Sequence, residues 1–268
     1  MKAAYYAGKG GAITIEDLPD PEPGPGELLI RVHRCGICGT DLSMTKGDLW
    51  DYGAGQYGHE FAGEIIGMGK GVEGYCMGEK ISVVPSGACG LCAGCTGGGN
   101  HVMCRSADSA ARGFAEMATL PASLAVKLPD TLSMADGALI EPLAVSLYGV
   151  RMAPMKPGDR VLVLGGGTVA LYAIYWARRL GAGKIVAASR SARRKDLCLA
   201  MGADAFVTFG DAETGEVAEA LGGAPDIVFE CVGAEGMLGK AITHAKIYGH
   251  VTSLGFCTHP DPVMPAMA

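Results

Sequence analysis

The feature that most constrains this chain is a glycine-rich turn in its second half. The segment Val161-Leu-Val-Leu-Gly-Gly-Gly-Thr-Val-Ala170 runs from an apolar strand pattern directly into a helical pattern. Gly165 permits the tight turn, Gly167 allows a ligand to approach the backbone, and the small Ala170 permits close helix–strand packing. The unpaired N–H groups at the start of such a helix suit a phosphate group. We therefore predict a dinucleotide-binding turn here.

Strand and helix patterns alternate around this turn from about residue 154 to residue 254. Alternation with short loops predicts a parallel, doubly wound Rossmann sheet covered by helices on both faces. Five strands are countable, whereas such a sheet usually has six. The predicted strands are Arg160–Leu164, Lys184–Ala188, Ala205–Thr208, Asp226–Cys231 and His250–Leu254. The predicted helices are Thr168–Leu180, Ala192–Met201, Glu213–Leu221 and Gly236–Ala245. The alternative is a ligand-free glycine turn in an ordinary α/β domain.

The end of the second predicted strand indicates which dinucleotide is bound. An NAD site places Asp or Glu there, because a carboxylate holds the ribose 2′-OH. This chain has Ser189-Arg190, and Arg194 follows shortly after. A hydroxyl and guanidinium groups suit a 2′-phosphate, so we predict NADP, with NAD as the alternative. If no ligand binds, these arginines are a solvated helix start. The predicted cofactor-binding residues are Gly165, Gly167, Thr168, Val169, Ser189, Arg190 and Arg194.

Short β-strand patterns, separated by proline and glycine, characterise the first half. They are Ala12–Ile15, Glu27–His33, Gly63–Ile66, Lys80–Val84 and Phe114–Leu120. We predict an α/β chain with a β-rich domain over residues 1–150 and a dinucleotide-binding domain over residues 151–268. A second glycine pattern, Gly67–Gly71, precedes no helical pattern, so we expect no nucleotide there.

Composition narrows the partners and the compartment. A formal net charge of −6 argues against nucleic acid or an anionic membrane as partner. The N-terminus has no signal-peptide pattern, and no apolar run is long enough to span a bilayer. We therefore predict a cytoplasmic protein. The chain has ten cysteines, and in such a reducing compartment the clustered ones are expected to bind metal rather than to form disulfides.

Four cysteines lie close together in a glycine-rich loop with the spacing C-x2-C-x2-C-x8-C. They are Cys89, Cys92, Cys95 and Cys104. Four thiolates enclose a tetrahedral Zn²⁺ with no open position, which is the pattern of a structural site. The loop has few apolar residues, so metal binding would supply its folding energy. Accidental spacing or a disulfide pair is the alternative.

A second group of metal-ligand types is dispersed along the first half. Cys38, His59 and Glu141 offer one sulfur, one imidazole and one carboxylate, which leaves a position open as catalytic zinc requires. Cys35-x-x-Cys38 also has the spacing of a redox pair, but it lies outside any thioredoxin-like pattern. Cys35 is therefore expected to be a small buried apolar residue.

These motifs together resemble a known family. Gly58-His59-Glu60-x2-Gly63-x5-Gly69-x2-Val72 is similar to the zinc-alcohol-dehydrogenase signature. Cys38-Gly-Thr-Asp41, the cysteine cluster, Glu141-Pro-Leu and the cofactor glycines follow in the order of the zinc-dependent medium-chain alcohol dehydrogenases. The sorbitol- and threonine-dehydrogenase-like branch is the most similar. The resemblance covers essentially all 268 residues and implies a GroES-like β-rich catalytic domain followed by a Rossmann domain.

The resemblance also implies residue roles. Cys38 and His59 would be catalytic zinc ligands, and Glu141 a third ligand or the partner of a zinc-bound water. Glu60 would exchange on and off the metal. Either Glu60 or Glu141 can therefore be the carboxylate that binds the zinc directly. One catalytic and one structural zinc are expected.

The same comparison implies two further catalytic residues beside Glu60. Asp41 would orient His59, and Thr40 would relay the substrate proton. Ser43 stands where many relatives have the histidine that ends the relay. The cysteine cluster also departs from the family, since its last spacing is eight residues rather than the usual seven.

The implied function is transfer of hydride between a secondary alcohol or polyol, or its ketone, and NADP(H). Relatives continue beyond this length to a sixth strand and part of the substrate pocket, and pair as homo-oligomers. We therefore expect the C-terminal end to be missing, and a catalytically silent zinc- and nucleotide-binding fragment is the alternative. A zinc-free quinone or enoyl reductase is disfavoured, because those relatives generally lack the Cys38/His59 pair and the cysteine cluster.

Overall fold

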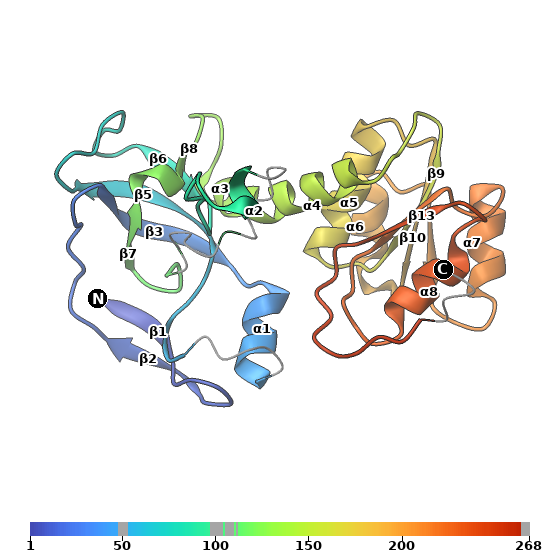
Figure 1. Cartoon of the computed structure of the whole chain (residues 1–268), viewed down its shortest axis with the longest axis horizontal. Helices are drawn as coiled ribbons and strands as arrows, with labels where there is room; N and C mark the ends of the chain where they lie inside the picture. The colour runs from blue at the N-terminus through green and yellow to red at the C-terminus, as the bar shows by residue number, and fades with distance from the viewer. Residues whose placement is uncertain (48–52, 97–103, 105–109, 111, 264–268) are drawn as a thin grey trace. The chain divides into compact units, whose positions relative to one another are not determined.

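The computed structural model describes the chain except residues 48–52, 97–103, 105–109, 111 and 264–268 (Figure 1). The chain divides into two compact units, Met1–Glu141 and Pro142–Ala268. The helix α4 (Ile140–Met152) contains this division. The predicted domain boundary at residue 150 lies in the same helix and stays a prediction. No helix in the described part of the chain is long and apolar enough to cross a membrane.

The described residues of the first unit form two sheets. A three-stranded sheet has the order β2-β1-β4, and a five-stranded antiparallel sheet has the order β7-β3-β5-β6-β8. The strands are β1 (Lys2–Tyr6), β2 (Ile13–Asp17), β3 (Glu27–Gly36), β4 (Gly55–Gln56), β5 (Glu60–Met68), β6 (Lys80–Val83), β7 (Met117–Pro121) and β8 (Ala125–Lys127). The helical segments are α1 (Gly39–Lys46), α2 (Ala93–Thr96), η2 (Ala122–Leu124) and α3 (Met134–Ala138). The larger sheet surrounds a buried apolar core that includes Leu28, Ile30, Phe61, Ile65, Ile81 and Leu120.

Glycine at position 69 is explained by backbone packing. A Cβ atom there would lie 1.8 Å from the carbonyl oxygen of Gly24. The backbone after β5 therefore approaches the loop before β3 more closely than any side chain allows. The next described element after this segment is the strand β6 (Lys80–Val83).

The second unit is a parallel sheet of five described strands in the order β11-β10-β9-β12-β13, which confirms the predicted fold class. The strands are β9 (Arg160–Leu164), β10 (Lys184–Ser189), β11 (Ala205–Thr208), β12 (Ile227–Glu230) and β13 (His250–Ser253). The helices after α4 are α5 (Thr168–Arg179), η3 (Ala192–Arg194), α6 (Lys195–Ala200), α7 (Glu213–Leu221) and α8 (Met237–His244). The loops are short, as the alternating pattern predicts.

Successive residues of β9 face opposite sides of this sheet. Val161 and Val163 belong to a core cluster with α5 and α6, whereas Leu162 and Leu164 belong to a cluster with α7 and α8. Every strand residue from 161 to 164 is fully buried. Helices therefore cover both faces of the sheet, as the doubly wound pattern requires (Figure 1).

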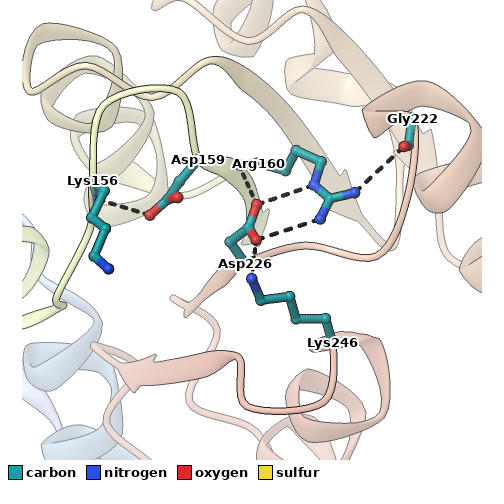
Figure 2. A network of polar contacts seen from close by, with 6 residues as sticks. All are labelled: Lys156, Asp159, Arg160, Gly222, Asp226 and Lys246. Atoms are coloured by element: carbon teal, nitrogen blue, oxygen red, sulfur yellow. Dashed lines mark hydrogen bonds and ion pairs between the residues drawn. The ribbon is translucent and has the colours of Figure 1, made fainter.

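Asp226 joins three segments of the second unit at the start of β12 (Figure 2). Its carboxylate accepts hydrogen bonds from the Arg160 backbone N–H at 2.8 Å and from Arg160 Nε at 3.0 Å, and it pairs with Lys246. The hydrogen bonds from Arg160 hold the pKa of Asp226 well below its usual range, and the Lys246 ammonium acts in the same direction. Only 14% of the side chain is exposed, so solvent screens the pairs little.

We expect Asp226→Asn to lower the free energy of unfolding at neutral pH by about 2 kcal/mol, because charge-assisted bonds to a buried carboxylate are lost. The depressed pKa makes this contribution complete above the unfolded value of about 4, and it is lost as pH falls below that value. Urea unfolding of both proteins across this pH range measures the effect. Glu79→Gln, which breaks the surface pair with Lys127, is the control and should lower the free energy of unfolding much less than Asp226→Asn, because solvent screens an exposed pair. Equal stability of Asp226→Asn and wild type at neutral pH would contradict this account.

Candidate functional site

Three side chains with different ligand atoms converge in the first unit. Cys38, His59 and Glu60 place sulfur, nitrogen and oxygen atoms within 4.8 Å of one another. The pairing of β3 with β5 explains this convergence, because Gly36 and Glu60 are partners in register. Cys38 lies two residues after the end of β3, and His59 lies one residue before the start of β5. The antiparallel pairing of Gly36 with Glu60 therefore places Cys38 and His59 at the same end of the strand pair.

Two glycines are required by the close packing around this cluster. A Cβ atom on Gly36 would lie 2.2 Å from the Glu60 carboxylate. Gly58 has φ +98°, and a Cβ atom there would lie 2.8 Å from the Phe114 ring and 2.9 Å from Cys35 Sγ. Glycine is therefore required at position 58 by the backbone conformation and the close packing, next to the two ligand types His59 and Glu60.

Asp41 lies directly behind His59. One carboxylate oxygen accepts the Cys38 backbone N–H at 2.8 Å and so stabilises the start of α1. The other lies 3.6 Å from His59 Nδ1 and, in the described part of the chain, accepts no hydrogen bond although it is buried. Thr40 reaches the same cluster, with its hydroxyl 3.6 Å from Cys38 Sγ.

Acidic groups outnumber basic ones around this cluster. Burial is the largest cause that raises the pKa of Cys38, Asp41 and Glu60. Glu141 lies outside the group of three ligand atoms, but burial, followed by the charges of Glu60 and Asp41, raises its pKa to about 7, while His59 opposes the shift. A cation would relieve this crowding of buried acids, and sulfur, nitrogen and oxygen together suit Zn²⁺. The donor set therefore fits a zinc ion.

The four predicted cysteines also gather. Cys89 Sγ lies 3.9 Å from Cys95 Sγ, Cys92 Sγ lies 3.5 Å from Cys95 Sγ, and the Cys89 N–H points at Cys104 Sγ from 3.4 Å. All four thiols are free, so no disulfide forms among them. A tetrahedron with Zn–S bonds of about 2.3 Å has S···S edges of about 3.8 Å, which matches these separations.

Backbone N–H groups favour the ionised form of one cysteine in this cluster. The N–H groups of Leu91 and Cys92 lie 3.5 and 3.3 Å from Cys89 Sγ. They lower the pKa of Cys89 to about 6. A thiolate is the form that binds a metal, so the loop is arranged for the second zinc ion.

The glycine-rich turn joins β9 to α5 as predicted. Gly165 has φ +122°, a conformation that a side chain would strain. Gly167 precedes α5 without a side-chain cap, and a Cβ atom there would meet open space. Thr168 and Val169 open the helix, and Ala170 is fully buried behind the turn. The turn therefore offers an open helix start, which fits a bound phosphate group.

The predicted 2′-phosphate residues lie around the same turn. Arg194 donates a hydrogen bond to the Gly166 carbonyl oxygen at 3.0 Å. Ser189 Oγ would lie 3.7 Å from a Cβ atom placed on Gly166. Arg190 is exposed at the end of β10. The structure thus brings Ser189 and Arg194 to the turn and leaves Arg190 in solvent.

No sequence signal marks Ser146, which nonetheless supports the turn. This residue is fully buried in α4, and its hydroxyl lies 3.1 Å from the Val169 carbonyl oxygen and 3.0 Å from that of Pro142. The Trp176 indole N–H donates to the Leu143 carbonyl oxygen at 2.9 Å. These contacts attach α4 to α5. A lone serine within a helix carries no pattern that would reveal this role.

A β-rich unit with a sulfur–nitrogen–oxygen metal cluster, together with a parallel unit that has a dinucleotide turn, defines a metal- and dinucleotide-dependent oxidoreductase. Comparisons with known proteins support this class. The descriptions "Alcohol dehydrogenase GroES-like domain" and "Zinc-binding dehydrogenase" match residues 24–130 and 168–268. The (R,R)-butanediol dehydrogenase of Bacillus subtilis (strain 168) is 33% identical over 98% of this chain and 81% of its own length.

Two further relatives agree with this result. An L-threonine 3-dehydrogenase of Legionella pneumophila subsp. pneumophila (strain Philadelphia 1) is 31% identical over 98% of this chain and 80% of its own. A protein from Sinorhizobium meliloti 1021, described as a zinc-binding dehydrogenase and solved bound to NADP, has a TM-score of 0.89 and 33% identity. It matches 98% of this chain and 79% of its own.

The chain belongs to the zinc-dependent medium-chain alcohol dehydrogenase family and is an alcohol or polyol oxidoreductase. This result confirms the family and enzyme class that the sequence predicts, and it favours the enzyme over the silent fragment.

Proposed function

We propose that this protein oxidises a secondary alcohol or polyol, or reduces the corresponding ketone, with NADP(H). The observation that carries the proposal is the convergence of Cys38, His59 and Glu60 in one unit. The names of relatives support the substrate class, since they refer to butanediol, L-threonine and sorbitol. We further propose a cytoplasmic protein that acts on small molecules rather than on nucleic acid or membranes, consistent with its net charge of −6.

The residues at this site have separate proposed roles in binding the metal and in orienting its ligands. Cys38 and His59 would hold the catalytic zinc together with a carboxylate from Glu60 or Glu141. Zinc supplies Lewis-acid chemistry that polarises an alcohol or carbonyl oxygen, and NADP supplies hydride chemistry. Asp41, 3.6 Å from His59 Nδ1, orients the ring so that Nε2 is available to a metal.

Thr40 is the proposed acceptor of the substrate's hydroxyl proton. Its hydroxyl lies beside Cys38 Sγ, so a substrate at this cluster would be within its reach. A hydroxyl group both accepts and donates, which lets it pass a proton on to solvent.

The preference for NADP rests on charge at the end of β10. Ser189 and Arg194 lie near Gly166, and no carboxylate stands at the position that holds a ribose 2′-OH in an NAD site. Guanidinium groups there attract a 2′-phosphate. The predicted cofactor is therefore NADP, whose adenosine ribose carries a 2′-phosphate.

A substrate panel tests the proposal. Secondary alcohols, vicinal diols, polyols and amino alcohols are each offered with NADP and with NAD, and formation of the reduced cofactor is followed by absorbance. We expect turnover on at least one class, faster with NADP. Primary alcohols oxidised faster than every secondary one, or equal catalytic efficiency with NAD, would contradict the corresponding part of the proposal.

We expect Cys92→Ser to remove the structural zinc without removing the catalytic one. Metal content should fall from about two ions per chain to about one, because three thiolates do not close the tetrahedron. The loop should then be cut faster by protease, since metal binding supplies its order. Metal analysis and limited proteolysis measure this. Cys198→Ser, in the core of the other unit, is the control for zinc content. Retention of about two ions by Cys92→Ser would count against the site.

A further inference from the structure

Glu230 is a buried carboxylate at the carboxyl end of β12, and none of the steps above uses it. The residue is 2% exposed. Its Oε1 accepts the backbone N–H groups of Val232 at 2.6 Å and Gly233 at 2.9 Å, and its Oε2 accepts the Ser253 hydroxyl at 3.1 Å. Within the described ranges it forms no ion pair with a basic side chain. These donors, two of which belong to one short loop, satisfy both oxygens of the buried carboxyl group.

That loop, Cys231–Gly233, lies against the glycine-rich turn. A Cβ atom on Gly165 would lie 3.4 Å from the Cys231 carbonyl oxygen and 3.4 Å from a methyl group of Val232. Val232 nevertheless remains 44% exposed. An apolar side chain is thus held at the rim of the turn and is still accessible to a ligand.

The strand order places this loop where ligands bind. In the order β11-β10-β9-β12-β13, the chain continues in opposite directions from β9, first to β10 and later to β12. Ligands of open parallel sheets bind beyond the carboxyl ends of the strands at this switch point. Gly165 follows β9 and Glu230 ends β12, so they face one another across it.

The segment that follows β13 (His250–Ser253) contacts the same loop. A Cβ atom on Gly255 would lie 2.5 Å from Glu230 Oε2, and one on Gly233 would lie 2.4 Å from the Phe256 backbone nitrogen. The Leu254 N–H also donates to the Glu230 carbonyl oxygen at 2.7 Å. Glu230 therefore joins the end of β12, the end of β13 and the loop Cys231–Gly233.

We propose that Glu230 is a positioning residue for the dinucleotide. Its carboxylate holds Cys231–Gly233 in place, so that the Val232 side chain is already positioned beside the glycine turn before a nucleotide binds. A loop ordered before binding spares the nucleotide the cost of ordering it, which increases affinity. The inference rests on the proposed dinucleotide function and adds to it a residue that touches no ligand.

Glu230→Gln tests the inference, because glutamine keeps the size but replaces a charged acceptor with a neutral one, which weakens the hydrogen bonds from Val232 and Gly233. We expect the Kd for NADP, measured by calorimetry without substrate, to rise about tenfold, with unchanged zinc content. KM for NADP should rise more than kcat falls. An unchanged Kd in folded Glu230→Gln would overturn the inference.

Glu213→Gln is the matched control. Glu213 is a buried carboxylate of the same unit that pairs with Lys240 at 2.6 Å and His244 at 2.8 Å, away from the switch point. This variant should lower Tm while it leaves the Kd for NADP at the wild-type value. An equal rise in Kd in both variants would show a general loss of stability and would overturn the positioning role.

Hydrogen exchange of the wild-type chain keeps the inference testable if Glu230→Gln does not fold. The amides of Val232 and Gly233 should be protected before any nucleotide is added, because Oε1 already accepts them. Exchange at unprotected rates would overturn the inference. Failure of the wild-type chain to bind NADP or NAD would instead overturn the proposed function, whatever the exchange rates show.

Discussion

Replacing Cys38 with serine is expected to lower kcat/KM by about 10³-fold or more and to remove about one zinc ion per chain. Serine is a weak zinc ligand at neutral pH, and the remaining His59 and Glu60 do not hold the metal alone. The dinucleotide turn lies in the other unit, so the Kd for NADP should stay near its wild-type value. Metal analysis, steady-state kinetics and calorimetry of the same preparation measure the three quantities.

Cys76→Ser is the matched control for this variant. Cys76 is an exposed cysteine of the same unit that belongs to neither metal cluster. Its replacement should leave zinc content and kcat/KM unchanged. Cys38→Ser with full activity and two zinc ions would show that this thiol is not a ligand, and the catalytic cluster would have to be reassigned.

Replacing Ser189 with aspartate is expected to lower the ratio of kcat/KM for NADP to that for NAD by about 100-fold or more. A carboxylate at the end of β10 repels a 2′-phosphate and accepts the ribose 2′-OH of NAD. Both effects change the ratio in the same direction. Parallel kinetics with the two cofactors, at one fixed substrate concentration, measure it.

Lys195→Ala controls for the loss of local positive charge. This exposed lysine begins α6, one residue beyond Arg194, and is not among the predicted cofactor residues. Its replacement should change the ratio by less than about threefold, because an exposed charge is strongly screened. An unchanged ratio in Ser189→Asp would show that another part of the chain selects the cofactor.

The second unit was the more predictable from sequence because its periodicity is strong. The strand Arg160–Leu164 and the helix Glu213–Leu221 were predicted with their observed bounds. Buried parallel strands are continuous apolar runs, and helices between them have a different period, so each element begins and ends at a clear change. The predicted helix 192–201 begins in the structure as the 3-10 turn η3 and ends one residue earlier, at Ala200.

Fewer elements of the first unit could be predicted from the sequence. α1 was not predicted, because its N-cap is Cys38 rather than Ser, Thr, Asp or Asn. The strands β1, β4 and β8 and the helix α3 were also not predicted, and neither was α4, which contains the division between the units. The predicted strand Phe114–Leu120 begins only at Met117. Short strands with one exposed face carry weak patterns, and tertiary pairing decides their limits.

The site residues were predicted by type and order, but their arrangement depends on register. The sequence alone predicts both Glu60 and Glu141 as candidate ligands. The pairing of Gly36 with Glu60 in the structure places Glu60 beside Cys38 and His59. A one-residue slip would turn Glu60 to the other face, and no local pattern fixes that register. Glu230 was missed for a similar reason, since nothing in its sequence shows that the carboxylate turns back onto the next loop.

The most direct test of the proposed reaction follows the hydrogen that is transferred. A secondary alcohol deuterated at the carbinol carbon is oxidised by the wild-type chain, and the reduced cofactor is analysed by mass spectrometry. The account predicts one deuterium per molecule of NADPH formed, loss of the reaction on chelation, and its return when zinc is restored. Reduced cofactor without deuterium, or undiminished turnover by the zinc-free chain, would contradict it.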